Sequence, residues 1–280
     1  MNPAKITVLA PGLIGGSVAL AASRAFPKAK ISVWTRRAES LPSIQATLPQ
    51  AEVGTDLSLV SGSDLIVLGA PPSALGTLAR ALLPFLSSTT LVTDVSSIKE
   101  SVEKSVSSIF QGKARWIGSH PMAGSEESGI RAARPELFQK APVILTPTSS
   151  TPAETLRDAT SFWQALGGRV LSMTPAEHDQ QVARISHLPH FIATALVLAA
   201  GSDSLSLAGS GYRDTTRVAA GPSTLWAEIL IGNQSQVLAS LKNFRTSLES
   251  LTFALEKGEA GALAKILDDA AKIRRTLPTS

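Results

Sequence analysis

The sequence predicts an α/β protein: an N-terminal doubly wound parallel sheet followed by a domain built only of helices. Short apolar runs alternate with helical segments up to about residue 170, a pattern typical of parallel strands covered by helices on both faces. From Pro175 onward no segment has the pattern of a strand. We therefore expect one domain at 1–170 and an all-α domain at 171–280.

The strands of the first domain are expected where β-branched and aliphatic residues run together. Helical segments, for example 14–25, 74–86 and 98–109, separate them. Ligands of such sheets bind in a crevice outside the carboxyl ends of the strands. The expected strands span 5–10, 31–35, 64–72, 90–97, 115–121 and 141–147.

The second domain is expected to contain two long helices and a short last one. The first long helix covers 176–201 and includes Pro189, which can kink it; the second covers 223–258 and ends at Gly258, a plausible cap. These helices are apolar on too many faces for a monomer, so we expect a homodimer formed through this domain. The apolar run 191–201 is too short to cross a bilayer and predicts a buried helix, hence no membrane partner.

Composition excludes several classes of protein. The absence of cysteine excludes disulfides, cysteine-ligated zinc and a thiol nucleophile. The net charge of +4 comes from scattered basic residues, so no nucleic-acid partner is expected. The N-terminus lacks the pattern of a signal peptide, which predicts a cytoplasmic protein. An anionic small-molecule substrate or a phosphorylated cofactor fits the mild basic excess.

The segment "LAPGLIGGSV" at 9–18 resembles the glycine-rich turn of a Rossmann-type dinucleotide-binding unit, G-x-G-x-x-G. Ala10 stands at the first glycine, a role it can fill if its φ is negative, and Pro11 follows. An ordinary strand–turn–helix is the alternative. The second glycine lets the backbone approach a pyrophosphate at the helix N-terminus, and the third lets helix and strand pack closely. The expected cofactor-binding residues are Gly12, Leu13, Ile14 and Gly15, with Ala70 and Pro71 at the end of the strand at 64–72.

The end of the second strand favours NADP over NAD. An NAD-binding protein usually places an acid there to bind the ribose hydroxyls, whereas this chain has Thr35, Arg36 and Arg37. An arginine can pair bidentately with a 2′-phosphate, and a threonine hydroxyl can donate to it. The alternative is that the two arginines form a solvated helix start. We expect NADP as the preferred cofactor, with NAD as a second.

The four histidines are placed unevenly along the chain. His120 follows a predicted strand where the crevice should open, whereas His178, His187 and His190 lie within thirteen residues of the helical domain. His187 and His190 are three apart and share a helix face. Their spacing is not that of a zinc site, and no set of carboxylates lies near, so no metal is expected.

Three motifs in order, "GSHPMAGSEESG" (118–129), "SHLPH" (186–190) and "GYRDTTRVAAGPSTLW" (211–226), resemble the prephenate/arogenate dehydrogenase family of tyrosine biosynthesis. The resemblance covers nearly the whole chain. It implies oxidative decarboxylation of prephenate to 4-hydroxyphenylpyruvate, or of arogenate to tyrosine, with hydride transfer to NADP or NAD. It also implies a two-domain form with neither a preceding chorismate mutase domain nor a following regulatory domain.

The resemblance also implies roles for individual residues. His120 matches the catalytic histidine and Ser97 its serine partner, although Ser97 or Ser96 could instead cap the helix that follows. Arg217 matches an arginine that clamps a carboxylate. His187 is expected to be structural and His178 a hinge or cap residue. The remaining substrate contacts are expected at His190, Ser186, Ser125, Trp226 and Arg213, the last with Asp214 near a site shared between subunits.

Three departures from the family pattern and two alternative functions remain open at this point. The departures are Ala10, Arg36, and Pro222-Ser223 in place of an Asp-Pro pair. One alternative is a two-domain NADP-dependent dehydrogenase of the β-hydroxyacid type, for which Lys242 would be the candidate lysine, though without its usual context. The other is a non-catalytic NADP-binding sensor, which would not need His120, Ser97 and Arg217 together.

Overall fold

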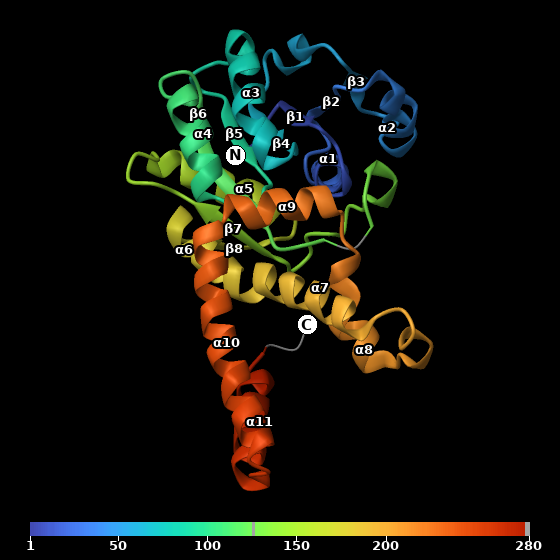
Figure 1. Cartoon of the computed structure of the whole chain (residues 1–280). Coiled ribbons are helices and arrows are strands. Elements are labelled where there is room, and N and C mark those ends of the chain that lie inside the picture. Colours follow the sequence, from blue (N-terminus) through green and yellow to red (C-terminus); the bar gives the residue numbers. More distant parts are fainter. Residues whose placement is uncertain (125–126, 278–280) are drawn as a thin grey trace. The chain divides into compact units, whose positions relative to one another are not determined.

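The computed structural model describes residues 1–124 and 127–277 (Figure 1). By its internal contacts the chain divides into two units, Met1–Gln234 and Ser235–Ser280. The sheet and the helices up to α9 belong to the first unit, and α11 with nearly all of α10 belongs to the second. The boundary expected near residue 170 falls inside the last strand of the sheet, and the division 1–170 and 171–280 stays a prediction.

The first unit is built on one eight-stranded sheet with the strand order β3-β2-β1-β4-β5-β6-β7-β8. Neighbouring strands are parallel except β6 and β7, which are antiparallel. This arrangement confirms the doubly wound Rossmann-type fold that the sequence predicts. The strands are β1 (Lys5–Leu9), β2 (Lys30–Trp34), β3 (Glu52–Gly54), β4 (Leu65–Leu68), β5 (Leu91–Asp94), β6 (Arg115–Pro121), β7 (Pro142–Thr146) and β8 (Arg169–Ser172).

Helices cover both faces of this sheet because successive strand residues point to opposite sides. In β4, Leu65 and Val67 join a core with α1 and α5, whereas Ile66 and Leu68 join a second core with α3 and α4. A central strand such as β4 therefore needs apolar residues on both of its faces, which explains its continuous apolar run. The helices of this part are α1 (Leu13–Ala25), α2 (Leu41–Thr47), α3 (Pro72–Leu82), α4 (Glu100–Phe110) and α5 (Ala153–Ala165).

The helix expected at 176–201 is continuous but changes its winding in the middle. The segment consists of α6 (Pro175–Val182), a π-helical turn (Ala183–His187) and α7 (Leu188–Ala200). Pro189 lies in the first turn of α7, directly after the wider π-turn. Such turns are frequent at functional sites, and this one carries part of the "SHLPH" motif. Then follow α8 (Ser210–Thr216), a 3₁₀ turn (Arg217–Ala220) and α9 (Ser223–Gly232).

The prediction of one helix at 223–258 is wrong, because Asn233 interrupts it. Its backbone has φ −119° and ψ 30°, which ends α9 before α10 (Gln234–Glu256) begins. The buried Asn233 side chain donates from Nδ2 to the carbonyl oxygen of Asp179 at 2.8 Å. This tertiary hydrogen bond fixes the break. Gly258 has φ +66° after the end of α10, which confirms the predicted cap.

The prediction of a buried helix at 191–201 is also wrong for the single chain. Within α7 only His190 and Ala193 are buried, and Leu198 is 78% exposed. Among the described residues, the helix Pro175–Ala200 is long and apolar enough to cross a membrane by length and composition alone. The same helix carries Asp179, which is buried and hydrogen-bonded to backbone groups at the start of α4, so it is packed into the fold of the first unit.

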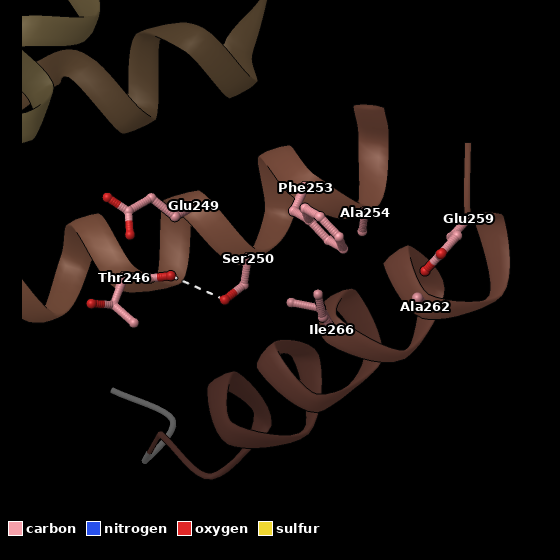
Figure 2. Close-up of a pocket in the computed structure, with 8 residues that line it drawn as sticks. All are labelled: Thr246, Glu249, Ser250, Phe253, Ala254, Glu259, Ala262 and Ile266. Atoms are coloured by element: carbon pink, nitrogen blue, oxygen red, sulfur yellow. Dashed lines mark hydrogen bonds between the residues drawn. The ribbon is translucent and has the colours of Figure 1, made fainter. Parts of the chain in front are cut away.

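The second unit is a helical hairpin of α10 and α11 (Ala260–Arg275). A shallow hollow of about 410 Å³ lies between these helices. Figure 2 shows Phe253 of α10 facing Ile266 of α11 across it. No residue of α11 is buried, and large apolar side chains of both helices remain exposed. A face of this kind is typical of a protein–protein contact.

Candidate active site

A cavity of about 540 Å³ opens at the carboxyl ends of β1, β4, β5 and β6 in the first unit. This is the edge of a doubly wound sheet at which ligands bind. The cavity is closed on its other side by residues of the π-turn, the 3₁₀ turn and α9. Its described lining consists of residues 12–15, 69–72, 95–97, 120–124 and 127–129, with Ser186, Arg217, Val218, Gly221, Pro222, Leu225, Trp226 and Ile229.

The glycine-rich turn contradicts the expected negative φ at Ala10. Ala10 has φ +57°, the left-handed region that favours glycine. Its N–H donates to the Trp34 carbonyl oxygen at 2.9 Å, and its own carbonyl oxygen accepts from the Gly12 N–H at 3.0 Å. The turn therefore keeps the backbone geometry of the missing first glycine. Alanine in that conformation costs about 1–2 kcal/mol.

The two remaining glycines of the turn have different surroundings. A Cβ on Gly12 would meet no atom within 4 Å, so the backbone there faces open space. A Cβ on Gly15 would lie 3.2 Å from the Ala10 carbonyl oxygen, so Gly15 permits close packing of helix against strand. Gly12 is also the N-cap of α1, whose first turn holds no acidic residue. Free N–H groups and the helix dipole at such a terminus suit a phosphate group.

Thr35, Arg36 and Arg37 lie next to this turn, because the Trp34 carbonyl accepts the hydrogen bond from Ala10. Thr35 is buried, and its hydroxyl oxygen accepts from the Arg37 N–H at 3.3 Å. Both arginine side chains are exposed. None of the three is among the described residues that line the cavity.

His120 lines the cavity at the end of β6 and belongs to a chain of buried hydrogen bonds. Its Nδ1 lies 2.8 Å from Nε2 of His178, and Nδ1 of His178 lies 2.8 Å from Oδ1 of Asp179. Burial holds the pKa of His120 well below its ordinary value, and the neighbouring His178 and Lys99 lower it further. Burial also lowers the pKa of His178, against the opposing effect of Asp179. Both rings are therefore neutral near pH 7.

Asp179 also caps the helix that follows β5. Its Oδ1 accepts from the Lys99 N–H at 2.7 Å and its Oδ2 from the Glu100 N–H at 2.9 Å. The alternative that Ser96 or Ser97 caps this helix is therefore wrong. Ser97 lines the cavity, and the buried Ser96 Oγ, in the same lining, has no hydrogen-bond partner among the described residues. The capping contact from α6 leaves both hydroxyls available to a ligand.

A buried ion pair that no sequence motif indicates lies beneath the site. The Lys99 ammonium lies 2.5 Å from Oδ2 of Asp94 and donates to the Ser119 carbonyl oxygen at 2.7 Å. Oδ1 of Asp94 accepts from the Ser119 N–H at 3.0 Å. Burial lowers the pKa of Lys99, and Asp94 opposes this effect. The pair ties the end of β5 to β6 at the residue before His120.

The helical part of the first unit contributes Ser186, Arg217 and Trp226 to the cavity. His190 is absent from the described lining: its ring stacks on Trp226 with centroids 3.6 Å apart and planes 9° apart. Arg213 is exposed on α8, where its Nε donates to the Ala208 carbonyl oxygen, and it does not belong to that lining either. Ser125 lies outside the described residues.

The two histidines without an expected catalytic role have distinct positions. His178 lies inside α6, not at its cap, and contacts His120, so the prediction of a cap residue is wrong. His187 is buried, and Asn233 Nδ2 lies 3.2 Å from its Nδ1. Burial lowers the pKa of His187 to about 4. Among the described residues, no three His, Asp or Glu side chains are grouped as a metal site requires.

Comparison with known proteins identifies the family. Residues 19–172 match the family model described as prephenate dehydrogenase, nucleotide-binding domain, and residues 174–269 match the model described as prephenate dehydrogenase, dimerization domain. The chain belongs to the prephenate dehydrogenase family. This membership confirms the resemblance drawn from the three motifs and makes the protein an oxidoreductase of tyrosine biosynthesis. The first match begins at residue 19, after the glycine-rich turn.

Individual members of the prephenate dehydrogenase family resemble the chain over nearly its full length. It is 32% identical to the cyclohexadienyl dehydrogenase of Zymomonas mobilis subsp. mobilis, covering 98% of this chain and 96% of the relative. The crystal structure of Synechocystis arogenate dehydrogenase is 34% identical with a TM-score of 0.82, covering 97% of this chain and 99% of the other. The A. aeolicus prephenate dehydrogenase, solved with hydroxyphenyl propionate and NAD⁺, is 29% identical with a TM-score of 0.89. The match covers 97% of this chain and 96% of the other.

Proposed function

We propose that the protein catalyses the oxidative decarboxylation of prephenate or arogenate, with NADP as preferred hydride acceptor and NAD as a second. The observation that carries the proposal is the convergence of His120, Ser97 and Arg217 on one cavity beside the glycine-rich turn. A neutral histidine, a hydroxyl and a guanidinium are the groups needed to bind an alcohol next to a carboxylate.

The residues present fit a nicotinamide dinucleotide, which accepts a hydride when bound. The open space at Gly12 and the N-terminus of α1 suit its pyrophosphate. Residues 69–72 and 95–97 continue the same lining toward His120. The Ser96 hydroxyl, which has no hydrogen-bond partner within the described part of the chain, can bond a polar group there. The A. aeolicus relative was solved with NAD⁺. These features support the assignment of Gly12, Leu13, Ile14, Gly15, Ala70 and Pro71 to cofactor binding.

His120 is the proposed base. A hydride leaves the carbinol carbon while His120 accepts the hydrogen bond, and then the proton, of the hydroxyl group. The carbon–carboxylate bond breaks, CO₂ departs, its electron pair enters the ring, and the proton returns to the oxygen of the new phenol. Such a base works best as neutral imidazole, the form that the lowered pKa of His120 favours. Ser97 is proposed to bond the same hydroxyl group.

The proposed substrate is a dianion, and the helical residues of the lining supply its contacts. The guanidinium of Arg217 is proposed to hold a carboxylate bidentately. Ser186 is proposed as a further donor and Trp226 as an apolar wall. His190 is proposed to act on the substrate through Trp226, on which it stacks. Ser125 and Arg213 remain proposed contacts from the family resemblance alone.

The preference for NADP rests on the end of β2. Arg36 lies two residues beyond Trp34, whose carbonyl pairs with the glycine turn, and no acid is present there to repel a 2′-phosphate. Thr35 accepts a hydrogen bond from the Arg37 backbone, so its own proton is available to a phosphate oxygen. These groups support NADP without excluding NAD.

A homodimer is proposed through the helical part of the chain. The match to the dimerization-domain model supports it. So do the large apolar side chains exposed on the helices of that region, an arrangement that a second copy would cover. The exposed residues include Phe191, Leu196, Leu198, Leu248, Phe253, Leu267 and Ile273.

A two-by-two assay tests the function. Prephenate and arogenate are each assayed with NADP and with NAD, and the reaction is monitored by the absorbance of the reduced cofactor. We expect reduction with at least one substrate and a higher kcat/KM for NADP. Cofactor binding without reduction by either substrate would support the NADP-sensor alternative. The β-hydroxyacid alternative has no support in the cavity, since Lys242 is exposed on α10 and absent from its described lining.

A further inference from the structure

Three buried side chains connect the cavity to the start of α4. His120 lines the cavity, His178 lies behind it, and Asp179 lies behind His178. His120 is 8% exposed, and the other two are at most 1% exposed. Both links are 2.8 Å long, a normal hydrogen-bond length. The three residues come from β6 and α6, which are more than fifty residues apart in the chain.

The donor and acceptor at each link follow from Asp179. An ionised carboxylate only accepts hydrogen bonds, and the N–H groups of Lys99 and Glu100 already donate to this one. Nδ1 of His178 must therefore carry a proton and donate to Asp179. Since a neutral imidazole has one N–H, Nε2 of His178 is then an acceptor.

The same reasoning fixes the tautomer of His120. Its Nδ1 faces the acceptor nitrogen of His178, so Nδ1 carries the proton and donates. Nε2 of the neutral His120 then bears the lone pair, and this is the nitrogen left for a ligand. The other tautomer would present an N–H to the substrate hydroxyl, which could donate a hydrogen bond but could not accept the proton.

We propose that His178 and Asp179 are positioning residues, which hold His120 in the tautomer that can accept a proton from the substrate. The proposal rests on the proposed function. Because Asp179 also fixes the start of α4, one carboxylate orders both His120 and the segment that carries Ser97. When His120 becomes protonated, its Nδ1–H still donates to His178, and the Asp179 carboxylate favours the resulting positive charge. A histidine held by a carboxylate in serine hydrolases is oriented on the same principle.

We call His120, His178 and Asp179 the relay. Few charged or titratable groups surround it among the described residues. Lys99, paired with Asp94, and His187 both act to lower the pKa of His120. Asp179 and Asp94 act to raise that of His178. Asp179 is the one among them that hydrogen-bonds directly to a ring of the relay, so its removal is the selective perturbation.

Histidine-selective ¹⁵N NMR on the free protein tests the tautomers without any assay of activity. We expect His120 and His178 both as Nδ1–H tautomers near neutral pH, and an increase of the Nε2–H form of His120 in His178→Phe, which removes the acceptor. An Nε2–H tautomer of His120 in the wild-type protein would overturn the proposal. This readout stands even if neither cyclohexadienol is a substrate, so its failure is distinct from a failure of the proposed function.

Steady-state kinetics then test the role of the relay. We expect His178→Phe to lower kcat by about 10²-fold or more, with KM and the Kd for NADP nearly unchanged. His178→Gln, which keeps a side-chain oxygen able to accept from His120, should recover part of that loss. Asp179→Asn should move the acid limb of the kcat profile to lower pH, because removing the anion disfavours the protonated relay.

His187→Gln is the matched control, since His187 is a buried histidine of the same helical segment that is absent from the described cavity lining. It should lose stability and change the pH profile less than Asp179→Asn does, because among the described residues His187 is hydrogen-bonded to neither ring of the pair His120–His178 and acts on His120 only at a distance. If His178→Phe and Asp179→Asn lost only stability and kept the kcat and pH profile of the wild type, the two residues would be purely structural and the proposal would fail.

Discussion

His190 and Trp226 lie ring on ring, with their centroids 3.6 Å apart and their planes within 9° of each other. Trp226 lines the cavity. His190 is buried, packs against the Trp226 ring and does not belong to the described lining. We predict that His190→Phe, which keeps a flat ring, leaves KM for the cyclohexadienol within about threefold of the wild type. His190→Ala removes the support and should raise KM about tenfold or more, a change worth about 1.4 kcal/mol of binding. If the two variants raised KM equally, His190 would contact the substrate through its nitrogens.

Replacing Ala10 by glycine should stabilise the protein. Ala10 has φ +57°, which costs an alanine about 1–2 kcal/mol, whereas glycine loses about 0.5–1 kcal/mol in conformational entropy. We predict a net gain of about 0.5–1 kcal/mol in the free energy of unfolding, measured by urea denaturation. Lys140→Gly is the matched control, because Lys140 has φ +60° and lies in a loop away from the cavity lining. Both variants should gain stability; a loss of stability in Ala10→Gly would contradict the prediction.

Much of the fold and part of the site follow from the sequence, because strands that alternate with helices must form a parallel sheet whose carboxyl ends meet. This reasoning places Gly12 and His120 at one crevice. It could not place His178 against His120, because that contact joins residues far apart in the chain through the packing of α6. Nor could it foresee the break at Asn233, whose side chain bonds to a distant carbonyl group. Sequence patterns report local preferences, and tertiary hydrogen bonds overrode them at these positions.

Gly12 should tolerate a methyl group in the free protein but not beside a bound cofactor. Its φ is −80°, and a Cβ there would meet no protein atom within 4 Å. We predict that Gly12→Ala leaves the free energy of unfolding within about 0.5 kcal/mol but weakens NADP binding at least tenfold, measured by titration. Gly209→Ala is the control, because Gly209 is also a helix N-cap with φ −82° and open surroundings. Equal NADP affinity in both variants would place the pyrophosphate elsewhere.

Arg36 is the residue expected to decide between the two cofactors. We predict that Arg36→Asp lowers kcat/KM for NADP at least tenfold and raises it for NAD, because a carboxylate repels the 2′-phosphate and accepts from ribose hydroxyls. The ratio of the two kcat/KM values is the measurement. Arg37→Asp introduces the same charge one residue further along an exposed segment and should change the ratio less. A larger change in Arg37→Asp would assign the phosphate contact to Arg37.

Stability should fall in mild acid, in part because of His187. Burial lowers the pKa of this histidine to about 4 in the folded protein, whereas its ordinary value is 6.5. The unfolded state therefore binds a proton first, and the contribution of neutral His187 is complete above pH 6.5 and lost progressively as the pH falls to about 4. His120, His178 and His190, whose pKa values burial also lowers, act in the same direction. We predict that His187→Gln, although less stable at pH 7.5, loses less further stability than the wild type between pH 7 and 4.5 in urea titrations. Identical losses in the two proteins would show that His187 titrates normally in the folded state.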